Sequence, residues 1–226
     1  MSVATLLAPS IDQSPTSPVD ERLCLELSTT APDNQVPDDL VIYRLSVAQY
    51  HTMATAGILK DGDPVELLEG LLVQKMTKNP PHTVATQLIQ EALRTILPVG
   101  WRVPSQEPIT LVASEPEPDL AVVRGGIRRY LDHHPGPEDL ALVIEVADAT
   151  IRRDRGSKKR IYARAGVRIY WVVNLVENRI EVYTDPTGPI QTPNYRQQQN
   201  YSPSDMIPVI IEGREIGQLA MQELLP

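Results

Sequence analysis

The chain has 226 residues, 42% of them hydrophobic, which fits one soluble globular domain with extensions and excludes disorder of the whole chain. Its net charge of −8 argues against a simple nucleic-acid binder, because such proteins are usually basic. Its single cysteine, Cys24, excludes an internal disulfide, and no apolar run approaches the roughly 18 residues needed to cross a bilayer, so we expect a cytoplasmic protein without a membrane partner.

The N-terminal segment has a different composition from the rest of the chain. Residues 1–40 are rich in Ser, Pro, Thr and Asp and hold seven acidic residues against the single base Arg22, so −6 of the −8 lies there. Such a segment cannot bury enough apolar surface to offset its chain entropy. We therefore expect a loosely ordered acidic arm over residues 1–40, followed by one domain over residues 41–226.

The domain is predicted to begin with a helix and a hairpin. Ser46 and Gln49 have the spacing of a capping box, and the helix formers that follow end at Gly57. Residues 65–76, VELLEGLLVQKM, have the pattern of two strands with a break near Gly70.

A second helix and two extended segments follow. Residues 82–97 carry an apolar stripe with helical spacing, which Pro98 ends. Residues 101–112 contain prolines and predict edge or irregular strands, and residues 118–125 predict a short strand.

The second half of the domain alternates strands and one helix. The apolar run 140–144 predicts a strand buried on both faces, and a helix is expected from about 151 to 165, closed by Gly166. Residues 167–186 predict two strands joined by a turn at 177–178, and the C-terminal stretch predicts further strands. This alternation around one helix-flanked sheet predicts an α/β or α+β domain.

Glu145 poses a physical problem, because it follows directly on the buried run 140–144. A buried carboxylate normally takes up a proton, pairs with a cation or coordinates a metal ion. Asp119 heads the preceding strand, 26 residues earlier, and would converge with Glu145 if the two strands are neighbours. Two carboxylates at such range favour a divalent cation, and Mg²⁺ (or Mn²⁺) suits them because it is often held by one or two carboxylates.

The helix after Glu145 would supply the cationic half of such a site. Asp154, Lys158 and Tyr162 are spaced by four residues and share one helix face, with Lys158 as the group to position a water or stabilise charge on phosphorus. The neighbouring basic residues would contact flanking phosphates in a salt-dependent way; they are Arg152, Arg153, Arg155 and Lys159. Carboxylates, metal, lysine and a basic helix together indicate hydrolysis of a phosphodiester.

Three segments carry a family resemblance: VELLEGLLVQKMTKNPPH, EPDLAVVRG and LVIEVADATIRRDRGSKKRIYARAGVRIYWVVN. They resemble the Uma2 family of restriction-endonuclease-like proteins, also known as DUF820, over roughly residues 42–185. The resemblance implies the PD-(D/E)xK nuclease fold, a central mixed sheet flanked by helices, here with extra C-terminal strands. It also implies a metal-dependent endonuclease acting on DNA, and a homodimer by analogy with the superfamily.

The resemblance also implies roles for four individual residues. Asp119 matches the acid of the PD motif, Glu145 the second acid, and Glu66 the acid from the N-terminal part of the core, while His82 matches a position beside the site. Two residues after Glu145, where the superfamily has its lysine, this chain has Ala147, so the lysine role passes to Lys158 rather than Lys159. Many members carry an acid where this chain has Leu71, which leaves Glu69 as an alternative to Glu66.

Simpler interpretations remain open for these residues. Glu145 could pair with a nearby arginine, Asp119 could be a turn residue after Pro118, and the basic run could be a solvated helix face. Asp154, Tyr162 and His82 suit supporting roles. His133 and His134 lack ligand spacing to a third group, which disfavours a zinc site. The alternative function is a catalytically silent nuclease fold that binds nucleic acid or a protein.

Overall fold

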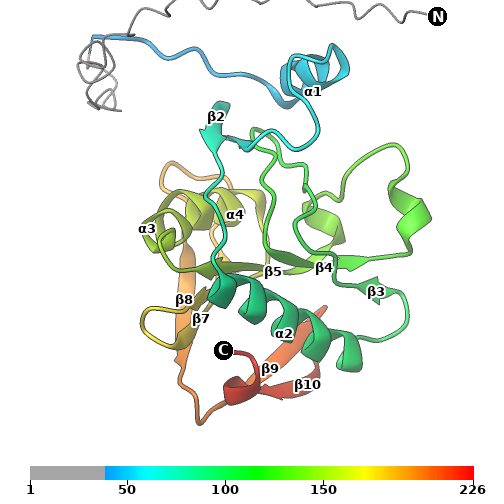
Figure 1. Ribbon diagram of the computed structural model, residues 1–226, viewed down its shortest axis with the longest axis vertical. Helices are drawn as coiled ribbons and strands as arrows, with labels where there is room; N and C mark the ends of the chain where they lie inside the picture. The colour runs from blue at the N-terminus through cyan, green and yellow to red at the C-terminus, as the bar shows by residue number, and fades with distance from the viewer. Residues whose placement is uncertain (1–38) are drawn as a thin grey trace, which may run out of the picture. The chain divides into compact units, whose positions relative to one another are not determined.

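A computed structural model describes residues 39–226 of the chain, and residues 43–226 form one compact unit (Figure 1). The acidic arm expected over residues 1–40 lies outside the described residues except for its last two. Within the described part, none of the helices has both the length and the apolar character that a membrane span requires.

The first elements follow the sequence closely. Helix α1 (Val47–Thr55) starts at Ser46, whose side chain and that of Gln49 form the expected reciprocal capping box. Strands β1 (Val65–Leu68) and β2 (Leu71–Gln74) form the predicted antiparallel hairpin, and Glu69 and Gly70 make its turn with positive φ angles.

Helix α2 (Pro80–Ile96) begins two residues earlier than predicted. Asn79 caps it, and the two prolines occupy its first turn, where a missing backbone N–H costs nothing. The prolines therefore start this helix rather than merely precede it.

Six strands form the central sheet in the order β3-β4-β5-β6-β7-β8. They are β3 (Trp101–Arg102), β4 (Leu120–Arg124), β5 (Leu140–Ala147), β6 (Ile169–Asn174), β7 (Arg179–Pro186) and β8 (Tyr195–Tyr201). Only β5 and β6 are parallel, so the sheet is mixed. The segment 101–112, expected to be extended, contributes only the two residues of β3, while 3-10 turns Ile127–Tyr130 and Pro137–Asp139 lie in the connection to β5.

The predicted helix 151–165 is divided into three parts. Helix α3 (Ile151–Arg153) leads into a π-helical turn (Asp154–Lys158) and then into α4 (Lys159–Ala165), which Gly166 ends in the left-handed conformation. Such π-helical insertions are rare and often occur at functional sites.

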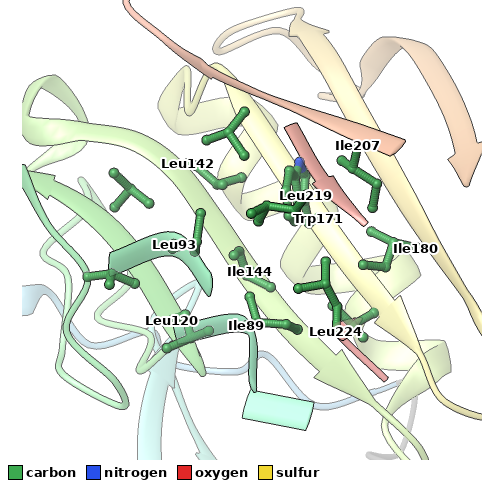
Figure 2. Packing of buried hydrophobic residues seen from close by; sticks show 14 of the residues in the cluster. Ile89, Leu93, Leu120, Leu142, Ile144, Trp171, Ile180, Ile207, Leu219 and Leu224 are labelled. Atoms are coloured by element: carbon green, nitrogen blue, oxygen red, sulfur yellow. The ribbon is translucent and has the colours of Figure 1, made fainter. Parts of the chain in front are cut away.

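Each face of the sheet is covered by a hydrophobic cluster. On one face, Ile89 and Leu93 of α2 pack against Leu120, Ile144 and Trp171, together with the C-terminal hairpin β9 (Met206–Ile211) and β10 (Arg214–Ala220) and the final turn Met221–Glu223 (Figure 2). On the opposite face, α4 packs with Ile161 and Tyr162 against the alternate residues of β4, β5 and β6. The result is the predicted mixed sheet flanked by helices, with extra C-terminal strands.

Candidate active site

Asp119 and Glu145 lie side by side at the junction of β4 and β5. The antiparallel register pairs Leu120 with Ile144, so the adjacent residues Asp119 and Glu145 lie opposite each other. The backbone N–H of Val146 donates a 2.8 Å hydrogen bond to Asp119 Oδ2 and fixes this arrangement. The convergence expected from the sequence is therefore present.

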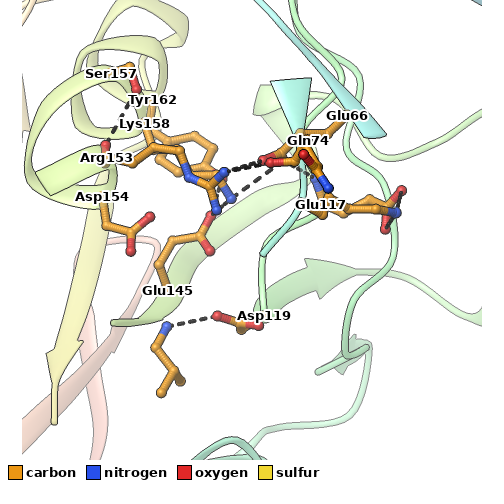
Figure 3. A network of polar contacts seen from close by, with 12 residues as sticks. Glu66, Gln74, Glu117, Asp119, Glu145, Arg153, Asp154, Ser157, Lys158 and Tyr162 are labelled. Atoms are coloured by element: carbon orange, nitrogen blue, oxygen red, sulfur yellow. Dashed lines mark hydrogen bonds and ion pairs between the residues drawn. The ribbon is translucent and has the colours of Figure 1, made fainter. Parts of the chain in front are cut away.

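Lys158 and Tyr162 reach Glu145 from the other layer of the fold (Figure 3). Lys158 Nζ donates to Glu145 Oε1 over 2.8 Å, and Tyr162 Oη donates to the same oxygen over 2.6 Å. All three side chains are almost completely buried. The partner of Glu145 in this structure is thus a lysine from the predicted helix face, rather than an arginine.

Glu66 on β1 completes the group around Lys158. Its Oε2 lies 3.4 Å from Lys158 Nζ and accepts a hydrogen bond from the backbone N–H of Glu117, while its Oε1 lies 3.9 Å from Arg153 Nη1. Glu69 is elsewhere, at the hairpin turn, where it pairs with Arg160. Of the two acids left open by the sequence, the structure brings Glu66 to the cluster.

The two remaining supporting residues take different positions. His82 in the first turn of α2 lies with Nε2 at 3.2 Å from Asp119 Oδ2, and its buried Nδ1 has no hydrogen-bond partner among the described residues. Asp154 lies buried at the start of the π-helical turn, and its backbone carbonyl accepts a hydrogen bond from Tyr170 Oη. His82 therefore contacts Asp119 directly, whereas Asp154 influences the pKa values of Glu145 and Lys158 through its charge.

One small cavity of about 90 Å³ is lined by Glu66, His82, Asp119, Glu145, Asp154 and Lys158. A larger cleft of about 1240 Å³ opens beside it, and Lys75 and Glu117, which form an ion pair of 2.9 Å, line both. The walls of the small cavity include, besides residues expected from the sequence, Lys75, Gln106, Glu117 and Asp148. No sequence signal marked these four residues, because their position depends on contacts between distant segments.

Burial and neighbouring charges shift the pKa values of the acids and of the lysine at this cavity. Burial raises the pKa of Glu145 to about 8, although the charge of Lys158 acts in the opposite direction. Burial also disfavours charge on Lys158, but Glu145, Glu66 and Asp154 outweigh it and hold the pKa of Lys158 above its ordinary value. Lys158 is therefore a stable cation in the midst of acids.

Asp119 shows the opposite behaviour to Glu145. Its burial alone would raise the pKa, yet hydrogen bonds from His82 and Val146 and the charge of Lys158 lower the pKa of Asp119 below its ordinary value. Burial raises the pKa of Asp154. The site thus holds one carboxylate that stays ionised and others that gain protons more easily.

The donor set fits a magnesium-like ion. Within residues 39–226, no three His, Cys, Asp or Glu side chains form a ready-made metal cluster. Mg²⁺ does not require one, because it keeps several waters and often binds one or two carboxylates. The hydrogen bonds to Asp119 all use Oδ2 and those to Glu145 use Oε1, so that within the described part of the chain the second oxygen of each carboxylate is not engaged.

The basic residues of the helix are mostly engaged inside the protein. Arg155 pairs with the buried Glu181 and with Glu177, and Lys159 Nζ lies 5.1 Å from the ring centre of Tyr183. Arg153 donates to the backbone carbonyl of Gln74 at the cavity wall. Arg152 is exposed, and no ion pair to it occurs among the described residues. The structure therefore brings Arg153 to the cavity and leaves Arg152 exposed, whereas Arg155 contacts Glu181 and Glu177, and Lys159 contacts the ring of Tyr183.

Comparisons with known proteins bear on the family and the fold of the chain. The family model Uma2, described as "Putative restriction endonuclease", matches residues 47–221. The chain is similar in structure to a protein from Anabaena variabilis described as a putative nuclease belonging to DUF820, with a TM-score of 0.57 and 16% sequence identity over 75% of this chain and 94% of the other. That likeness bears on the fold alone. No curated protein matches the chain.

Proposed function

Because this chain belongs to the Uma2 family, described as putative restriction endonucleases, we propose that it is a metal-dependent endonuclease that hydrolyses phosphodiester bonds of DNA. The observation that carries the proposal is the arrangement of Asp119, Glu145 and Lys158 around one small cavity. The two carboxylates are suited to bind a cationic cofactor, and the lysine is suited to stabilise an anionic transition state.

Asp119 and Glu145 would hold the divalent ion, Mg²⁺ or Mn²⁺, with Glu66 assisting. When bound, the ion lowers the pKa of water and polarises a phosphoryl oxygen, which is the chemistry that hydrolysis of a phosphodiester needs. The unengaged oxygens Oδ1 of Asp119 and Oε2 of Glu145 are the atoms available for this role.

Lys158 would stabilise the negative charge that develops on phosphorus. Its pKa is held above the ordinary value by the surrounding acids, so it remains protonated at neutral pH and suits electrostatic stabilisation better than deprotonation of a water. Its ammonium group has three N–H donors, so Lys158 can contact a phosphate while it keeps its hydrogen bond to Glu145.

Three groups would hold the carboxylates in place. His82 and the backbone N–H of Val146 share Oδ2 of Asp119, and Tyr162 donates to Oε1 of Glu145. Each of these bonds leaves the second oxygen of its carboxylate free, so the three groups orient the acids without blocking them.

DNA would approach through the basic residues near the cavity. Arg153 at the cavity wall and the exposed Arg152 are suited to bind phosphates on either side of the cleaved bond. A homodimer would present two such sites to one duplex.

The alternative is a silent nuclease fold that binds nucleic acid or a protein without cleaving it. The contact of Lys158 with Glu145 is the observation in its favour, because it gives both buried side chains a polar partner without a metal ion.

A cleavage assay tests the proposal. Supercoiled plasmid, single-stranded DNA and RNA are incubated at low salt with Mg²⁺ or Mn²⁺ and with native protein, Glu145→Gln or Lys158→Met, with Glu69→Gln as the matched control. We expect the native protein and the control to cut DNA, and both site variants to lose at least about two orders of magnitude in rate. DNA binding without cleavage by the native protein would favour the silent fold.

A further inference from the structure

Strand β8 forms one edge of the central sheet and has a free side. It pairs with β7 along its length, from Tyr195 opposite Pro186 to Tyr201 opposite Ile180. No segment within residues 39–226 pairs with its other side. All five residues between the two tyrosines are exposed.

This edge lacks the features that usually protect an edge strand. The opposite edge of the sheet, β3, is only two residues long, which is itself a protection against pairing with another chain. In contrast, β8 has seven residues, YRQQQNY, without proline, and its single charge on Arg196 is paired with Asp185 at 2.9 Å. A long unprotected edge is a template for a further strand.

The sequence of β8 is self-complementary about Gln198. In an antiparallel pair of two copies centred there, Tyr195 faces Tyr201, Arg196 faces Asn200 and Gln197 faces Gln199. No like charges oppose each other, and facing glutamines can form the ladders of side-chain hydrogen bonds that stabilise strand pairing. Tyr195 and Tyr201 are buried in the clusters on the two faces of their own sheet and take no part in the contact.

We propose that β8 pairs with β8 of a second copy of this chain around a two-fold axis at Gln198. The two six-stranded sheets would then form one continuous sheet, and the contact would be isologous, as is usual for dimers. The interface is independent of hydrolysis, since β8 carries none of the residues that line the small cavity.

Substitutions that introduce a charge at the two-fold axis test the interface. The masses of native protein, Gln198→Lys, Gln198→Glu and an equimolar mixture of the two variants are measured in solution by light scattering. We expect twice the 25.1 kDa chain mass for the native protein, a shift to the chain mass for each variant alone, and recovery of the dimer in the mixture. Gln87→Lys, at an exposed position of α2, is the control and should remain dimeric.

A cysteine pair tests the register. In a Cys24→Ser background, Gln198→Cys places two thiols opposite each other at a distance that allows a disulfide, whereas Arg196→Cys places them apart. Oxidation should cross-link the first variant and not the second. A monomeric native protein, a dimer that survives both charged substitutions, or equal cross-linking of the two cysteine variants would overturn the proposal while leaving the proposed function untouched.

Discussion

Lys158 donates a 2.8 Å hydrogen bond to Glu145 across two layers of the fold, from the π-helical turn to the end of β5. The pair answers the question that the buried carboxylate raises in the sequence. In the proposed function, it also places the cation that stabilises the transition state against one of the two acids that would hold the metal ion.

Removing one partner of this pair should cost more stability than removing both. Lys158→Met leaves Glu145 buried near Glu66 without its cation, and we expect a loss of roughly 3 kcal/mol in the free energy of unfolding. The double variant Lys158→Met with Glu145→Gln should recover part of that loss. Urea denaturation of the two single variants and the double variant measures this coupling, and strictly additive effects would contradict it.

Without metal, Glu145 should make the protein less stable as the pH rises. Its pKa is about 8 in the folded state and near the model-peptide value of roughly 4.3 when unfolded. Between these values the folded state binds the extra proton, so the free energy of unfolding contributed by this group falls with rising pH. Below the unfolded-state pKa, Glu145 is protonated in both states and does not change the free energy of unfolding. Above a pH of about 8, Glu145 is ionised in both states and its destabilising effect no longer increases.

This prediction is measured as a difference between variants in the presence of a chelator. The stability of Glu145→Gln relative to native protein should increase from pH 5 to pH 8, while Glu91→Gln, an exposed position on α2, should show no such trend. A pH-independent difference would show that Glu145 does not titrate in this range.

Glu66 and Glu69 form a matched pair for locating the third acid. Glu66→Gln removes a carboxylate 3.4 Å from Lys158, and we expect a loss of cleavage. Glu69→Gln breaks partly exposed ion pairs with Arg160 and Arg164, which should cost about 1 kcal/mol of stability or less and leave cleavage intact. The cleavage rates and unfolding temperatures of both variants are measured. Loss of cleavage in Glu69→Gln but not in Glu66→Gln would identify Glu69, at the hairpin turn, as the third acid.

Substitution of Arg155 should affect stability, whereas substitution of Arg152 should affect DNA binding. Arg155→Gln weakens the pairing of the buried Glu181, so we expect a lower unfolding temperature and little change in DNA affinity. Arg152→Gln should leave stability unchanged and reduce both the DNA affinity and its dependence on salt. Fluorescence anisotropy with labelled DNA across a salt series, in a Glu145→Gln background, measures both effects. Equal losses of affinity in the two variants would show that Arg155 also reaches DNA.

Local patterns in the sequence predicted much of the fold. The apolar run of β5, the capping box of α1 and the stop at Gly166 depend on neighbouring residues, and all three appear in the structure. The resemblance to the family added the mixed sheet. The four-residue spacing of Lys158 and Tyr162 also agrees with the structure, where both side chains donate to Oε1 of Glu145, and Asp154 precedes them in a π-helical turn.

The rest depended on contacts between distant parts of the chain. Arg160 finds its partner Glu69 91 residues earlier, and Arg155 finds Glu181 in β7, so a basic run that looks free in the sequence is largely neutralised within the fold. Lys75 and Glu117 likewise join the cavity wall through a pairing that no local pattern contains. Propensity and periodicity cannot report such pairs.

Metal binding tests the central claim most directly, because it requires no knowledge of the preferred substrate. Calorimetric titration of native protein with Mn²⁺ should show binding that is lost in Asp119→Asn and Glu145→Gln and kept in Glu69→Gln. Absence of binding to native protein, or binding that persists in both site variants, would contradict a metal centre at Asp119 and Glu145.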